Sequence, residues 1–171
     1  MRKKLFIIEM AVLLFLLLFI VALALAPRAK ACDTEDLVRS VISEEDEVRL
    51  AQMLYGEDRR MGDAEDTMKQ AAVIWCVFNR VDAWGKPISK VVVHSQFHGW
   101  KPGQKHPQWA HDIVRDVAYR YALEQCGIEN VGRVLPSDYL FFSNGGKHNK
   151  FRKGYRTKQY WDWDVENPYE E

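Results

Sequence analysis

Eight consecutive apolar residues, Ala71 to Phe78, lie inside a segment with helical character that runs from Met68 to Val81. A helix that is apolar on nearly every side has no face suited to water, so other elements must surround it. Asp66 or Thr67 is expected to begin this helix. The rest of the domain must therefore pack around this one segment, which makes a single core the expected arrangement.

The sequence before the buried helix predicts an amphipathic helix from Ser43 to about Gly56. Ser43 is a suitable N-cap, acidic residues follow in the first turn, and apolar residues recur at helical spacing. Residues 58–66 are polar and contain Gly62, which favours a loop. The first half of the domain is thus expected to be helical.

The second half predicts one long helix and a small β element. Pro107 is well placed as the first residue of a helix that runs to Cys126, and Gly127 ends it. Residues 88–97 are compatible with either a short helix or an extended piece. Tyr139 to Phe142 is typical of a strand, Ser143 to Gly146 of a turn, and Phe151 to Trp163 of an aromatic and basic return segment. The expected fold class is α+β, mainly helical.

The N-terminus predicts a targeting segment over residues 1–31. Arg2, Lys3 and Lys4 precede an apolar stretch from Leu5 to Ala26 that only Glu9 interrupts. At about 1.5 Å per residue it is long enough to cross a bilayer core of about 30 Å. Ala29-Lys30-Ala31 has the form of a cleavage site, so a signal anchor and a cleaved signal peptide both remain open. Either one sends the following chain out of the cytoplasm, anchored to the membrane or secreted to the cell wall.

Size and charge limit what the exported part does. Residues 32–42 are expected to be a linker and residues 43–171 one domain, and the protein is expected to be a monomer. Without residues 1–31 the chain has 19 basic and 23 acidic residues, so nucleic acid is not an expected partner. Cys76 and Cys126 are expected either to pair in an oxidising compartment or to stay free thiols.

Glu57 is the main candidate for chemistry. It follows Leu54-Tyr55-Gly56 at the end of one helix and precedes the apolar helix. A carboxyl group beside a low-dielectric wall retains its proton to higher pH, because burial disfavours the charged form. A glycosidic oxygen needs such a proton when its bond breaks. The alternative is a solvated surface glutamate.

Several short motifs bear a family resemblance. Tyr55-Gly56-Glu57, Ala71-Ala72-Val73-Ile74, Asn79-Arg80-Val81, Pro87-Ile88-Ser89-Lys90-Val91 and Gln96-Phe97 occur in this order. In order and spacing over residues 46–100 the chain resembles the SleB-type cell wall hydrolases, which include spore cortex-lytic enzymes. The resemblance implies a lysozyme-like domain similar to lytic transglycosylases, peptidoglycan glycan strands as substrate, no cofactor, and Glu57 as the essential acid.

The chain departs from that family just after Glu57. The family's short Ala-Arg-Gly-Glu sequence is replaced by Asp58 to Asp63, in a loop about four residues longer than theirs. A second catalytic acid therefore has only candidates by residue type, namely Asp58, Asp63, Glu65 and Asp66. Hydrolysis needs a second carboxylate, whereas a lytic transglycosylase closes the muramic acid 6-hydroxyl onto C1 without one. The lytic transglycosylase route is therefore favoured over hydrolysis.

Other residues are candidates for binding the glycan. Asn79 is expected either to cap the apolar helix or to hold a sugar N-acetyl group, and Phe97 either to fill the core or to stack on a sugar. The candidate substrate-binding residues are Asn79, Gln96, Phe97, Tyr139 and Tyr160. Basic residues from Lys147 to Lys158 form either a solvated face or a surface that attracts carboxylates of wall peptides or anionic wall polymers.

Two other function classes stay open. A zinc-dependent wall amidase or peptidase would use histidines among His94, His98, His106 and His111, but no His-Glu-x-x-His motif is present and Gly and Pro residues favour a loop there. No metal site is therefore expected. A non-catalytic peptidoglycan-binding module of the same fold is the remaining alternative.

Overall fold

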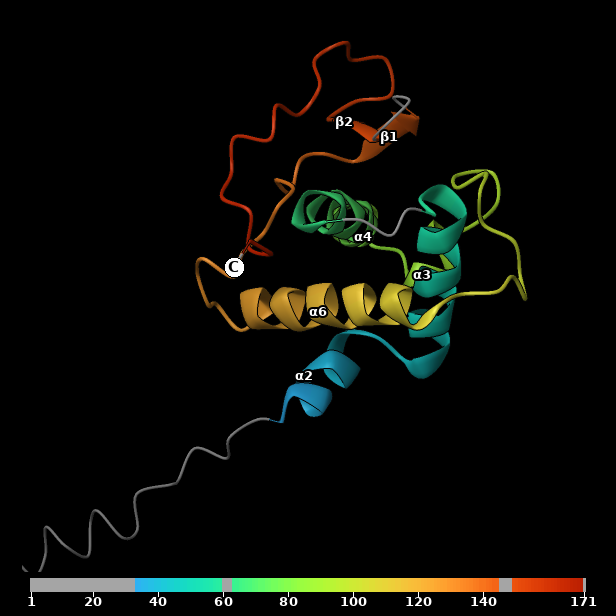
Figure 1. Ribbon diagram of the computed structural model, residues 1–171, viewed down its shortest axis with the longest axis vertical. Helices are drawn as coiled ribbons and strands as arrows, with labels where there is room; N and C mark the ends of the chain where they lie inside the picture. The colour runs from blue at the N-terminus through green and yellow to red at the C-terminus, as the bar shows by residue number, and fades with distance from the viewer. Residues whose placement is uncertain (1–32, 60–62, 145–148, 171) are drawn as a thin grey trace, which may run out of the picture. The chain divides into compact units, whose positions relative to one another are not determined.

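The computed structural model describes residues 33–59, 63–144 and 149–170 (Figure 1). Residues 33–171 form one compact unit, and the targeting segment expected over residues 1–31 lies outside the described residues. Within the described ranges, no helix has the length and apolar character needed to span a bilayer. These ranges contain five helices and one two-stranded sheet, so the mainly helical α+β class is confirmed.

Helix α4 (Ala64–Trp84) is the centre of the core, as its sequence predicts. Every residue from Ala71 to Phe78 is at most 1% exposed. The helix extends beyond the predicted range at both ends, because Asp63 caps it by accepting a hydrogen bond from the Asp66 amide at 3.1 Å. Gly85 ends it in the left-handed conformation, with φ of 59°. Figure 1 shows α4 between α6 and the hairpin.

Three other helices surround α4. Helix α3 (Glu44–Glu57) begins with a capping box between Ser43 and Asp46 and includes Glu57 as its last residue. Helix α5 (Ile88–Val91) settles the open choice for this segment, since a short helix forms directly after Pro87. Helix α6 (Gln108–Gln125) has Pro107 as its N-cap, so the predicted helix starts one residue later.

The β element is a hairpin that packs against α4. Strands β1 (Phe141–Asn144) and β2 (Asn149–Arg152) are antiparallel, with Phe142 paired to Phe151. The strand starts later than predicted, because the Tyr139 carbonyl accepts a hydrogen bond from Asn79 in α4 at 3.0 Å. Most of the predicted return to Trp163 is irregular, although the Trp161 amide donates to the Phe151 carbonyl at 2.8 Å.

The segment expected to be a linker contains a helix. Residues 34–41 form α2 (Thr34–Val41), which packs on α6. Buried Val38 supplies an apolar contact, and Glu35 pairs with Arg115 of α6. Arg39 pairs at 2.8 Å with Glu47 of α3. The linker interpretation of residues 34–41 was therefore wrong, because partners distant in sequence stabilise this short polar helix.

Glu47 connects these helices, and its charge should make stability depend on pH. Burial raises the pKa of this carboxyl, but hydrogen bonds from His111 and Arg39 and the charges of Arg39 and Arg115 outweigh burial and lower it. A lowered native pKa contributes stability above the unfolded-state pKa, and this contribution is lost as pH falls through the native value. Glu47→Gln should therefore cost about 1 to 2 kcal/mol at neutral pH and progressively less in acid. Urea unfolding at several pH values measures this difference, and a cost that stayed constant into acid would contradict the assignment.

Candidate functional site

Glu57 lies at the C-terminal end of α3, half-buried against the loop that follows α5. Its Oε1 accepts a hydrogen bond from the Gly99 amide at 2.7 Å. This bond joins residues 42 positions apart in the chain. It fixes one carboxyl oxygen and leaves the other without a backbone donor among the described residues.

Two glycines allow the loop to come this close. A Cβ on Gly56 would lie 2.0 Å from the Gly99 carbonyl oxygen, and a Cβ on Gly99 would lie 2.2 Å from the Gly56 carbonyl oxygen. Both obstacles are backbone atoms, which have no alternative rotamer. Each position therefore requires glycine, and the contact places the Gly99 amide at the Glu57 carboxyl.

Two further contacts hold the loop on α3 and the core. The Gln104 side chain donates to the Gln52 carbonyl at 2.7 Å. Phe97 is 1% exposed, and its ring centroid lies 5.8 Å from that of Phe142 in β1. The loop is thus anchored on both sides of Gly99, so the donor to Glu57 is preorganised.

The pKa of Glu57 is raised above the ordinary glutamate value. Burial is the largest cause, and it outweighs the hydrogen bond from Gly99 and the positive charges of His98 and Arg80, which lower the pKa. The groups that act on this carboxyl include no second carboxylate among the described residues. Glu57 therefore retains a proton at higher pH than a solvated glutamate does.

Arg80 is a site residue to which the sequence analysis gave no role. It is 3% exposed in α4, and its Nε donates to the Leu140 carbonyl at 2.5 Å. Its guanidinium lies 4.8 Å from the ring centroid of Phe97 and 5.4 Å from that of Phe141. Its Nη1 has no hydrogen-bond partner in the described part of the chain. The sequence did contain a signal for Arg80, because an arginine within an apolar helix is expected to be buried. A buried charge needs other groups that interact with it.

Asn79 has a structural position. It is 1% exposed, and its Nδ2 donates to the carbonyls of Pro136 at 2.8 Å and Tyr139 at 3.0 Å. Its Oδ1 accepts from Arg133 at 2.7 Å. It cannot cap α4, because that helix continues to Trp84. Asn79 therefore has almost no surface for a sugar, and its contacts are structural.

The other binding candidates divide by exposure. Phe97 and Tyr139 are 1% and 6% exposed, so both belong to the core. Gln96 is exposed beside the loop, and Tyr160 is 42% exposed on the segment after the hairpin. Only Gln96 and Tyr160 keep surface that a glycan could contact.

The candidates for a second acid have other partners or little exposure. Asp63 caps α4, and Glu65 pairs with Lys69. Asp58 directly follows Glu57 but is only 6% exposed. Asp66 lies in the first turn of α4. None of these four carboxylates acts on the pKa of Glu57.

The histidines and cysteines are placed elsewhere. His111 lies 2.9 Å from both Glu47 Oε1 and His106 Nδ1, and His94 contacts the Trp100 carbonyl. Among residues 33–59, 63–144 and 149–170, no three His, Cys, Asp or Glu side chains are arranged to hold a metal ion. Cys76 is buried and Cys126 exposed, and both are free thiols, so of the two alternatives left open for this pair the structure has the free thiols.

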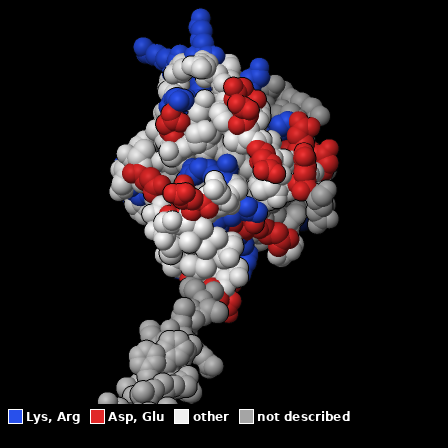
Figure 2. Space-filling model, turned by 90° about the vertical axis from the view of Figure 1, so that its left-hand side faces the viewer, with Lys and Arg blue, Asp and Glu red and all other residues white. Residues whose placement is uncertain are grey.

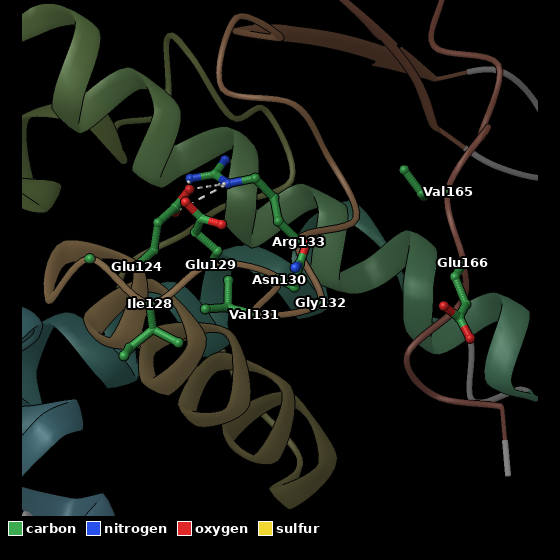
Figure 3. Close-up of a pocket in the computed structure, with 10 residues that line it drawn as sticks. Glu124, Ile128, Glu129, Asn130, Val131, Gly132, Arg133, Val165 and Glu166 are labelled. Carbon is green, nitrogen blue, oxygen red and sulfur yellow. Dashed lines mark hydrogen bonds and ion pairs between the residues drawn. The ribbon is translucent and has the colours of Figure 1, made fainter.

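A cavity of about 770 Å³ lies away from Glu57, between the turn after α6 and the C-terminal segment (Figure 3). Arg133 lines it and pairs with Glu124 at 2.5 Å, and Val165 and Glu166 lie on the opposite segment. The same guanidinium packs 4.0 Å from the ring centroid of Trp75. Arg133 therefore joins the core to this turn, which gives the cavity wall a structural role.

Comparison of the chain with family models, curated proteins and solved structures found no match.

Proposed function

We propose that this protein is a peptidoglycan-cleaving enzyme that breaks the glycosidic bond between N-acetylmuramic acid and N-acetylglucosamine, with Glu57 as the general acid. The observation that carries the proposal is the half-buried Glu57 carboxyl, whose pKa is raised by burial and whose orientation is fixed by the Gly99 amide. The proposed site also has exposed Gln96 beside the loop as a glycan contact. The proposed location is outside the cytoplasm, at the membrane or in the wall.

The proposed chemistry is of the lytic transglycosylase type. Glu57 donates its proton to the glycosidic oxygen as the bond to C1 breaks, and the sugar develops oxocarbenium character. The muramic acid 6-hydroxyl then attacks C1, and the Glu57 carboxylate takes the proton of that hydroxyl. We prefer this route because the groups that shift the pKa of Glu57 include no carboxylate among the described residues.

Product analysis tests this proposal. The full-length chain, purified in detergent, is incubated with purified peptidoglycan, and the released muropeptides are analysed by mass. Anhydromuramic ends are the expected products. Reducing ends would indicate hydrolysis of the same bond. Freed peptides would indicate an amidase or peptidase instead of a glycosidase. Binding without any release would leave only a non-catalytic module and contradict the proposal.

The dependence of activity on pH is a second test. Only protonated Glu57 donates a proton, so kcat/KM should fall as pH rises through the raised pKa of this group. The fall should occur at a higher pH than that of an ordinary solvated glutamate. Initial rates from pH 4 to pH 9, measured in buffers of constant ionic strength, show where kcat/KM falls. Activity that rose steadily over this range would contradict an acid role for Glu57.

A further inference from the structure

The charges at the C-terminal end of the sequence are separated into two blocks. Residues 139–161 contain six Lys or Arg and no Asp or Glu, whereas residues 162–171 contain five acids and no Lys or Arg. The exported chain as a whole is acidic, so this basic block is a local feature. We call its described part, residues 149–160 with Lys150, Arg152, Lys153, Arg156 and Lys158, the basic arm.

The strand pairing places the side chains of the hairpin on two opposite faces. Phe141 is paired with Arg152 and Ser143 with Lys150, so these four residues share one face. Phe142 and Phe151 occupy the other face, where Phe151 is 1% exposed. The basic side chains of β2 are therefore directed away from the packed face. Figure 2 shows Lys and Arg side chains projecting at its upper end, the end at which Figure 1 draws the hairpin.

Most of the basic arm's charge is not neutralised internally. Lys153 pairs with Asp138 at 2.5 Å. Within the described part of the chain, Lys150, Arg156 and Lys158 form no ion pair with a carboxylate. All three are exposed, so they present positive charge to a ligand from solvent.

Aromatic rings accompany these charges. Lys150 Nζ lies 5.5 Å from the ring centroid of Tyr160, and the Arg152 guanidinium lies 5.5 Å from that of Tyr155. Tyr155 is 72% exposed and Tyr160 42% exposed. Exposed aromatic rings beside cations suit a ligand that combines anionic groups with sugar or peptide surface.

The basic arm is continuous with the surroundings of Glu57. Tyr155 contacts Phe141 with 6.1 Å between ring centroids, and the Arg80 guanidinium lies over Phe141. The same guanidinium acts on the pKa of Glu57. On the other face of the hairpin, Phe142 packs on Phe97, two residues before Gly99. Packed side chains therefore connect the basic arm to the residues around Glu57.

We infer that the basic arm binds free carboxylates of the stem peptides on the glycan strand that enters the Glu57 site. This inference rests on the proposed function, because it names a feature of the same substrate. Short peptides match the patch better than a long polyanion does. A long polyanion would also meet the acidic residues that directly follow the arm, including Asp162, Asp164 and Glu166.

Binding measurements test the inference without requiring catalysis. Glycan strands of one length are prepared with free or with amidated stem carboxylates, and their Kd values are measured with the full-length Glu57→Gln variant. At low salt the free-carboxylate strand should bind about fivefold more tightly, because several exposed charge pairs each contribute modestly. The preference should decrease as salt screens these pairs.

Two double variants with the same change in charge show which lysines cause the preference for the free-carboxylate strand. Lys150→Glu/Lys158→Glu should remove the preference, whereas Lys86→Glu/Lys90→Glu, which changes two exposed lysines outside the arm, should retain it. Equal Kd values for both strands would overturn the inference, as would equal effects of the two double variants. The inference would also be overturned if a soluble phosphodiester wall polymer, or vesicles of anionic lipid, bound the arm more tightly than the free-carboxylate strand does. Such a result would assign the arm another partner. Preferential binding without cleavage by the wild type would overturn only the proposed function.

Discussion

Glu57→Gln should lower the rate of glycan cleavage by about 10²- to 10⁴-fold while leaving the fold intact. The glutamine side chain has nearly the same shape, and its carbonyl oxygen can still accept the hydrogen bond from the Gly99 amide. What the variant lacks is the proton that a neutral carboxyl group gives to the leaving oxygen. Mass analysis of muropeptides released over time by the two proteins measures the loss.

The control for this variant is Glu44→Gln. Glu44 is an exposed acid in the first turn of the same helix, so the substitution has the same chemistry at the opposite end of α3. Its cleavage rate should stay close to that of the wild type. A Glu57→Gln protein that retained most of its activity, with an unchanged unfolding midpoint, would contradict the acid role.

Gly56→Ala should destabilise the domain by about 3 kcal/mol or more and abolish activity, because the added methyl group meets backbone. Its Cβ would lie 2.0 Å from the Gly99 carbonyl oxygen and 2.4 Å from the Gly99 carbonyl carbon. Separating these backbones would also move the Gly99 amide from Glu57. Urea unfolding measures the first effect, and the cleavage rate of the folded protein measures the second.

Gly103→Asn is the control in the same loop. Gly103 has φ of 72°, a conformation that asparagine tolerates, and a Cβ there would have no neighbour within 4 Å. This variant should lose less than about 1 kcal/mol and keep its activity. If Gly56→Ala unfolded at the same urea concentration as the wild type, the close contact between the two glycines would not be what builds the site.

The sequence was sufficient for the elements that local pattern determines. The run from Ala71 to Phe78 required a surrounded helix, and α4 is that helix. Helix α2 was missed because it is short and polar, and because Arg115 of α6 provides one of its main contacts. Such a partner, 80 positions from Glu35, has no signature in the local pattern.

The site was predictable only in part for the same reason. The position of Glu57 beside an apolar helix predicted a half-buried carboxyl group with a raised pKa, as the structure has it. The donor from Gly99 and the charge of Arg80 depend on how a loop and a helix meet in three dimensions. Asn79 shows the opposite case, because its place in a motif suggested a ligand contact and its packing makes it structural.

Direct titration of the Glu57 carboxyl tests whether this group retains its proton to higher pH than a solvated glutamate does. Full-length protein with ¹³C-labelled glutamate side chains is titrated by NMR, and the Glu57 signal is identified by its absence in Glu57→Gln. We predict a pKa above that of the exposed glutamates in the same protein, because burial outweighs the Gly99 hydrogen bond and the charges of His98 and Arg80. A Glu57 pKa equal to or below those of the exposed glutamates would contradict it.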